Sequence, residues 1–226
     1  MLPMTPEVLY TVDQGSSAFE EGRAAVNIVC AGDSLTGWNN FGLADSWPYC
    51  TFPDFLQKLC VPLGLRIANG GIAGEISDNG PQQVADYLGL FPNARYFVIG
   101  MGTNDLGTWP DTAATSKRII GNLGTMIQAV QDQDKQPILF NVPNANEDMF
   151  LPYVVRELRE KRNYHNARLK EFCREQGIPL ADIYSRLHDE HFADELHPND
   201  EGAKIIAEAV FEVLAPLHNS ERGSSR

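Results

Sequence analysis

Two short motifs carry the residue types of a nucleophilic active site. Ser34 stands in Gly-Asp-Ser-Leu-Thr-Gly at 32–37, directly after an apolar run at 25–31. A serine at a tight turn between a strand and a helix presents its hydroxyl beside backbone N–H groups. Asp194 precedes His197 by three residues, so its carboxylate can reach imidazole Nδ1 and leave Nε2 to face a hydroxyl. Together these residues would supply a nucleophile, a base and a group that orients the base.

Two further runs could stabilise the negative oxygen that such a nucleophile creates. The run Asn-Gly-Gly-Ile-Ala-Gly ends at Gly74, and its glycines allow close backbone approach and positive φ. Asn104 lies in Gly-Thr-Asn-Asp at 102–105 and carries an uncharged side-chain donor. A glycine N–H and an asparagine amide are typical donors of an oxyanion hole.

Each motif also has a purely structural interpretation. Ser34 could simply cap a helix, and Asp194 with His197 could be a surface pair without a function. The glycine run could be a plain turn, and Asn104 a turn-forming residue. For Asp33, which precedes the serine, we expect a hydrogen bond that stabilises the turn rather than attack on a substrate.

The pattern of apolar runs predicts the elements that would bring these motifs together. Short runs without strict alternation, bounded by Gly, Pro or Asn, are typical of strands buried on both faces. Such runs occupy 25–31, 65–68, 96–101, 137–142 and 178–183. Helical patterns occupy 47–60, 81–88, 113–131, 152–176 and 200–214. The alternation predicts a parallel sheet covered by helices on both faces, with ligands bound at the carboxyl ends of the strands.

Taken in order, the motifs resemble those of the GDSL/SGNH hydrolase family. The matching blocks are Gly-Asp-Ser at 32–34, Asn-x-x-x-x-Gly at 69–74, Gly-x-Asn-Asp at 102–105 and Asp-x-x-His-Pro at 194–198. The resemblance extends over about residues 25–214. It implies a flavodoxin-like three-layer α/β/α sandwich with a central, mostly parallel five-stranded sheet.

The same resemblance implies a role for each motif residue. Ser34 would be the nucleophile, with Asp194 and His197 completing a catalytic triad. The oxyanion hole would consist of Ser34, Gly74 and Asn104. Gly74 is preferred to Gly71 only because it lies five residues after Asn69.

The resemblance implies an esterase or acylhydrolase that acts on small or medium acyl groups through an acyl-serine intermediate. A small-molecule ester would be the substrate, and no cofactor would be needed. Two alternatives stay open: a carbohydrate O-acetyl esterase on the same scaffold, and a catalytically inactive binding module. Loops at 38–47, 106–109 and 144–150 would form the walls of the site. Candidates for its acyl pocket are Trp38, Phe41, Trp109, Met149 and Phe150.

Metal and dinucleotide binding are disfavoured by residue spacing. His188 and His191 flank two acidic residues, but the run is not the His-Glu-x-x-His of zinc hydrolases. Gly100 and Gly102 lack the third glycine of a dinucleotide loop, where Asp105 stands instead.

Composition excludes several other classes of protein. The chain has 226 residues, and 18 basic against 30 acidic residues give a net charge of −12, which disfavours nucleic-acid binding. No apolar run is long enough for a membrane span. No secretory signal is visible, although one removed beforehand would leave no trace. Four cysteines without a Cys-x-x-Cys pair indicate reduced thiols and a cytoplasmic setting. We expect a single domain over 1–226, with an N-terminal arm at 1–23 and a flexible tail at 218–226.

Overall fold

A central sheet of five parallel strands organises the structure, a computed structural model that describes residues 17–37 and 48–224. The strand order is β2-β1-β3-β4-β5, the flavodoxin-like order of doubly wound sheets. The strands are β1 (Ile28–Gly32), β2 (Ile67–Gly71), β3 (Tyr96–Gly100), β4 (Gln136–Phe140) and β5 (Leu180–Ala181). This confirms the predicted fold class, with each strand close to its predicted position.

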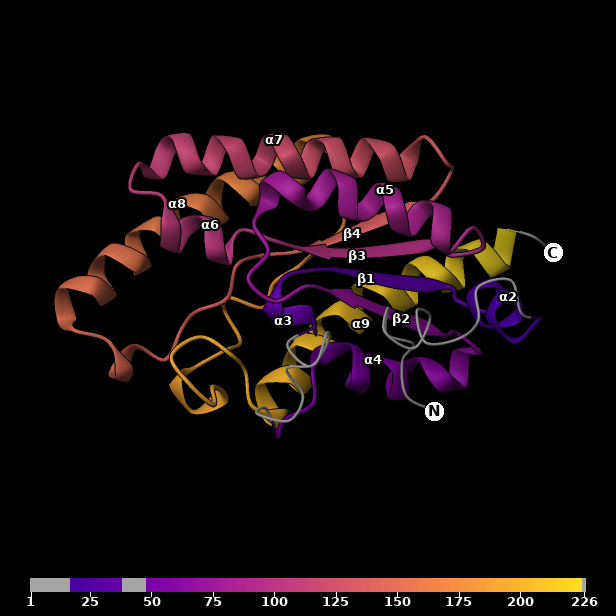
Figure 1. The fold of residues 1–226 in the computed structure, drawn as a ribbon, viewed down its shortest axis with the longest axis horizontal. Helices are drawn as coiled ribbons and strands as arrows, with labels where there is room; N and C mark the ends of the chain where they lie inside the picture. Colours follow the sequence, from indigo (N-terminus) through magenta and orange to yellow (C-terminus); the bar gives the residue numbers. More distant parts are fainter. Residues whose placement is uncertain (1–16, 38–47, 225–226) are drawn as a thin grey trace.

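Helices cover both faces of this sheet (Figure 1). On one face lie α5 (Gly80–Leu90), α6 (Thr103–Thr108), α7 (Thr112–Gln131) and α8 (Pro152–Gln176). On the other face lie α4 (Phe52–Cys60) and α9 (Asp200–Ser224). Alternate strand residues face the two layers: Val29 packs with the first group of helices, and Ile28 and Cys30 pack with the second. Burial on both faces explains why the strands read as continuous apolar runs.

Short helices complete the connections. The helix α2 (Ser17–Ala24) precedes β1, and the short helix α3 (Ser34–Gly37) follows β1 directly. The 3₁₀ helices are η3 (Val61–Leu63), η4 (Ser77–Asn79), η5 (Glu147–Met149) and η6 (Asp189–His191). The segment 17–23 was predicted to be irregular and is helical, whereas the rest of the predicted arm, 1–16, lies outside the described residues.

Glycine at the end of β2 lets α3 pack closely against the sheet. Gly71 pairs with Gly32 across the ladder. A Cβ atom added to Gly71 would lie 2.2 Å from the backbone nitrogen of Gly37. Because Gly71 has no side chain, the turn that begins at Ser34 can pack against the carboxyl ends of β1 and β2.

Two helices begin or end differently from their sequence prediction. The capping box of Thr51 and Asp54 starts α4 at Phe52 rather than at residue 47, with Thr51 N donating to Asp54 Oδ2 at 2.8 Å. The last helix was predicted to end at residue 214 but continues through Pro216 to Ser224. His218 Nδ1 lies 3.2 Å from the Tyr96 hydroxyl, a contact with β3 that supports this extension.

The segment at 106–109 was predicted to be a loop, but Thr103–Thr108 form the helix α6. Leu106 N donates to Gly102 O at 3.0 Å, which closes the first turn of this helix. The Asp105 side chain accepts hydrogen bonds from the backbone and the hydroxyl of Ser77. This long-range contact stabilises a helix that is too short to be evident from periodicity.

Candidate active site

Ser34, His197 and Asp194 form a continuous chain of hydrogen bonds at the carboxyl end of β1. Ser34 Oγ lies 3.0 Å from His197 Nε2, across 163 positions of sequence. His197 Nδ1 lies 2.8 Å from Asp194 Oδ2. The structure therefore brings together the serine, histidine and aspartate of the two sequence motifs. In this geometry the imidazole can accept the serine proton while the carboxylate holds the ring in place.

The backbone of its own turn holds Asp194 in position. Its Oδ1 atom accepts hydrogen bonds from Leu196 N at 2.8 Å and from His197 N at 2.6 Å. Partial burial raises the pKa of Asp194, but the hydrogen bonds from both backbone groups and from the His197 ring outweigh it. The net pKa is lower than that of an ordinary aspartate, so this carboxyl group is ionised at neutral pH.

The turn that presents Ser34 is held by the residue before it. Asp33 Oδ1 accepts a hydrogen bond from Leu35 N at 3.0 Å, which confirms the turn-stabilising contact predicted for this aspartate. The pKa of Asp33 is raised to about 7. Burial is the main cause, the nearby carboxylate of Asp105 adds to it, and the hydrogen bond from Leu35 partly offsets it. A carboxyl group that loses its proton less readily than an ordinary aspartate therefore lies beside the serine.

Gly74 and Asn104 come from different connections, after β2 and after β3, and are linked through Glu75. Gly74 has a φ of +78°, which favours glycine. Asn104 Nδ2 donates to the carbonyl of Glu75, the residue after Gly74, at 2.8 Å. Gly71 N donates to Asn69 Oδ1 at 3.1 Å, whereas neither Gly74 N nor Ser34 N donates to any described residue. Gly74 is therefore better suited than Gly71 to donate to a substrate oxygen.

Sequence reasoning missed two residues that join these connections. Ser77 donates through its hydroxyl to Asp105 Oδ1 at 2.6 Å and through its backbone to Oδ2 at 3.0 Å. Both residues are buried, and Asp105 lies next to Asn104. The contact fixes α6 relative to the segment after Gly74. The only sequence signal was the aspartate that ends the run at 102–105.

The predicted acyl-pocket residues separate in space. Phe150 lines a cavity of about 370 Å³ together with Asn104. Trp109 lies in a different hollow, where its ring stacks under the Arg118 guanidinium at 4.2 Å. Met149 is 57% exposed and lines neither of these hollows. Trp38 and Phe41 lie outside the described residues.

The other histidines and the cysteines are arranged as follows. Among residues 17–37 and 48–224, no group of three His, Cys, Asp or Glu side chains could hold a metal ion. His191 Nδ1 accepts a hydrogen bond from His188 N at 2.9 Å, so this pair closes the η6 turn. Cys30, Cys60 and Cys173 are buried free thiols and Cys50 is a half-buried one.

No helix in the described part of the chain is long and apolar enough to cross a membrane.

The chain has an α/β fold in which Ser34, His197 and Asp194 are joined by hydrogen bonds, and comparison with known proteins defines its class. The family model of GDSL-like lipases and acylhydrolases matches residues 30–205. The chain therefore belongs to the GDSL-like lipase/acylhydrolase family.

Solved structures support the fold at low sequence identity. A GDSL-like lipase from Bacteroides thetaiotaomicron matches with a TM-score of 0.64 and 20% identity over 94% of each chain. A carbohydrate acetylesterase from Sinorhizobium meliloti matches with a TM-score of 0.66 and 16% identity, over 85% of this chain and 99% of the other. A catalytic mutant of an acetylxylan esterase from Geobacillus stearothermophilus matches with a TM-score of 0.63 and 16% identity, over 84% of this chain and 94% of the other. No curated protein sequence matches the chain significantly.

Proposed function

We propose that this protein is a serine esterase that cleaves carboxylic esters of small or medium acyl groups through an acyl-serine intermediate. The main support is the 3.0 Å separation between Ser34 Oγ and His197 Nε2, with Asp194 bound to the opposite nitrogen of the ring. Membership of a hydrolase family and the 370 Å³ cavity beside Asn104 support it further.

In the proposed reaction, His197 Nε2 accepts the Ser34 proton as Oγ attacks the ester carbonyl carbon. The resulting oxyanion receives hydrogen bonds from Ser34 N–H, Gly74 N–H and the Asn104 amide. His197 then donates its proton to the departing alcohol, and the acyl group remains on Ser34. A water molecule, deprotonated by His197, attacks the acyl-serine and releases the carboxylic acid. Asp194 stabilises the imidazolium in both steps.

Replacing Asn104 tests the proposed oxyanion hole. Asn104→Ala should lower kcat by about 10²- to 10³-fold with little change in KM, because the lost donor acts mainly in the transition state. Asn104→Asp should be at least as damaging at neutral pH, since an ionised carboxylate repels the oxyanion. The measurement is the steady-state kinetics of a p-nitrophenyl ester.

Asn93→Asp is the matched control for this substitution. Asn93 Nδ2 also donates to a backbone carbonyl, that of Ala24, but it precedes β3 and so lies at the amino end of the sheet. Its replacement should leave kcat within about threefold of the original value. Near-normal turnover of Asn104→Asp would remove Asn104 from the oxyanion hole.

A carbohydrate O-acetyl esterase is the second candidate function. It is suggested by two structural neighbours described as a carbohydrate acetylesterase and an acetylxylan esterase. The apolar cavity beside Asn104 favours the first candidate, because an acetyl group would leave most of that space empty.

The deciding experiment measures hydrolysis of p-nitrophenyl esters from acetate to dodecanoate beside acetylated xylan. We expect kcat/KM to be highest for acyl chains of about four to eight carbons, since a cavity of this size suits a ligand of that order. A fluorophosphonate probe should label the protein and abolish the activity. Preference for acetylated xylan would support the second candidate, and absence of both labelling and hydrolysis would indicate an inactive binding module.

A further inference from the structure

The cavity beside Asn104 has apolar and polar residues in its walls, and apolar surface predominates. It has a volume of about 370 Å³, within the range of small-molecule sites. Its walls include Leu106, Phe150, Val154, Leu158 and Leu196. Because Leu196 precedes His197 in sequence and Asn104 is itself a wall residue, the cavity adjoins the proposed reaction centre. The hollow lined by Ser34 and His197 is smaller, so the larger cavity is the better place for a substituent of the substrate.

One wall of this cavity carries a buried positive charge. Arg162 on α8 lines the cavity and is only 4% exposed. The guanidinium has no hydrogen bond or ion pair with any of the described residues. Its neighbour Lys161, buried to a similar extent, is paired with Glu157 at 2.8 Å and donates to the Trp109 carbonyl at 3.2 Å. Arg162 therefore differs from the adjacent cation in lacking a protein acceptor.

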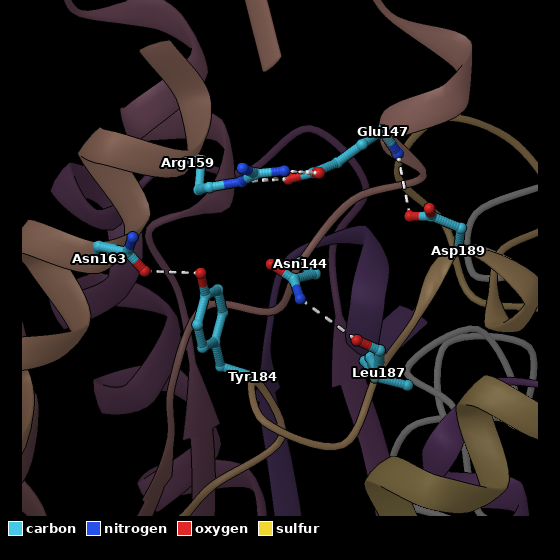
Figure 2. Close-up of polar contacts among 7 residues, drawn as sticks. All are labelled: Asn144, Glu147, Arg159, Asn163, Tyr184, Leu187 and Asp189. Carbon is cyan, nitrogen blue, oxygen red and sulfur yellow. Dashed lines mark hydrogen bonds and ion pairs between the residues drawn. The ribbon is translucent and has the colours of Figure 1, made fainter. Parts of the chain in front are cut away.

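Two groups that influence the charge of Arg162, the Glu147 carboxylate and the Tyr184 phenol, have other partners. Figure 2 shows both of these contacts. Glu147 accepts hydrogen bonds from two nitrogens of Arg159: Nε donates to Oε1 at 3.0 Å, and Nη2 donates to Oε2. The Tyr184 hydroxyl donates to Asn163 Oδ1 at 2.6 Å.

Two further hydrogen bonds hold the segment that carries Glu147 in place. Glu147 N donates to Asp189 Oδ1 at 3.1 Å, and Asn144 Nδ2 donates to the Leu187 carbonyl at 3.3 Å (Figure 2). These contacts anchor Glu147 near Arg159, so movement of this carboxylate to Arg162 would break an existing pair. Glu195 also lines the cavity, but it is exposed and makes no ion pair with Arg162.

A guanidinium that lines a cavity and has no acceptor among the described residues is available to hydrogen-bond a ligand there. Burial lowers the pKa of Arg162, whereas the neighbouring Tyr184 and Glu147 raise it. Arginine nevertheless stays protonated in proteins, so the desolvation cost remains. Its planar fork matches a carboxylate, which can accept two parallel hydrogen bonds. The apolar walls around it suit a short hydrocarbon chain.

We propose that this cavity binds the acyl part of an ester whose far end carries a carboxylate, and that Arg162 binds that carboxylate. The inference rests on the proposed esterase function and narrows its substrate class to monoesters of short dicarboxylic acids. Arg162 is thus a specificity-determining residue that contacts the substrate away from the scissile bond.

The test compares two esters that have the same number of carbons in the acyl group, mono-p-nitrophenyl adipate and p-nitrophenyl hexanoate. They differ only in the terminal carboxylate. Arg162→Gln should lower kcat/KM for the adipate monoester by about 10- to 100-fold, the loss expected for a hydrogen bond between charged groups. The adipate-to-hexanoate ratio of kcat/KM should fall by at least about tenfold, because the methyl end of the hexanoate offers no acceptor for the guanidinium.

Arg174→Gln is the matched control. It makes the same chemical change on the same helix, but Arg174 is exposed and paired with Glu171. Its ratio of adipate to hexanoate hydrolysis should stay within about threefold of the original. If Arg162→Gln does not fold, Arg162→Lys is the alternative variant. It keeps the positive charge but loses the planar guanidinium, so it should lower the ratio of adipate to hexanoate hydrolysis several-fold. An unchanged ratio in the folded Arg162 variants would overturn the proposal.

A binding measurement separates this proposal from the proposed function. Adipate is titrated calorimetrically into the Ser34→Ala protein and into Ser34→Ala/Arg162→Gln, so hydrolysis is not required. We expect at least about tenfold weaker binding to the double variant. Equal affinities would overturn the cavity assignment even if esters are hydrolysed. Conversely, tighter binding of adipate to Ser34→Ala than to the double variant would support the cavity assignment. This would hold even if neither ester is a substrate and the esterase proposal fails.

Discussion

Ser34→Ala should reduce ester hydrolysis at least about 10⁴-fold in kcat, the largest effect expected of any single substitution. The change removes only Oγ, the atom that lies 3.0 Å from His197 Nε2. Without it, no acyl-enzyme can form at this position, and only the oxyanion donors and substrate binding can still accelerate attack by water. The measurement is the steady-state hydrolysis of p-nitrophenyl hexanoate, together with labelling by a fluorophosphonate.

The control for this variant is Ser185→Ala, which removes the same atom from an exposed serine in the connection after β5. It should retain both labelling and turnover. Equal melting temperatures for the two variants and the parent would show that folding is not responsible. If Ser34→Ala kept more than about a tenth of the activity, Ser34 would not be the nucleophile.

Asp194→Asn should lower kcat by about 10⁴-fold while leaving the fold nearly unchanged. The asparagine oxygen can still accept from Leu196 N and His197 N, as Asp194 Oδ1 does. The amide nitrogen would replace Oδ2, however, and would donate to His197 Nδ1. The imidazole proton must then move to Nε2, so the ring can no longer accept the proton of Ser34.

Glu190→Gln removes a charge in the same way from an exposed residue of the preceding 3₁₀ turn and serves as the control. Its turnover should remain within about threefold of the original. A loss of less than about tenfold for Asp194→Asn would mean that another group orients His197. A similar melting temperature for the two variants would confirm that the loss is chemical.

The positions of the strands and the order of the motifs could be read from the chain because they depend on local pattern. Strands buried on both faces need continuous apolar runs, so all five were recognisable as segments. The helix ends were less evident where distant residues decide them. The contact between His218 and Tyr96 supports helix beyond residue 214, and the contact between Asp105 and Ser77 stabilises α6.

By itself, the sequence determined the doubly wound sheet and the positions of Ser34, Gly74, Asn104, Asp194 and His197 after predicted strands or before the last helix. The type and spacing of these residues were sufficient because Asp194 and His197 lie within one turn of each other. Only the tertiary structure decided which distant groups meet, such as Asn104 with the Glu75 carbonyl. It also separated Phe150 from Trp109 and placed Arg162 in a cavity. A single arginine in a strongly charged helix gives no local signal, since its burial and its lack of an acceptor arise from residues far away in the chain.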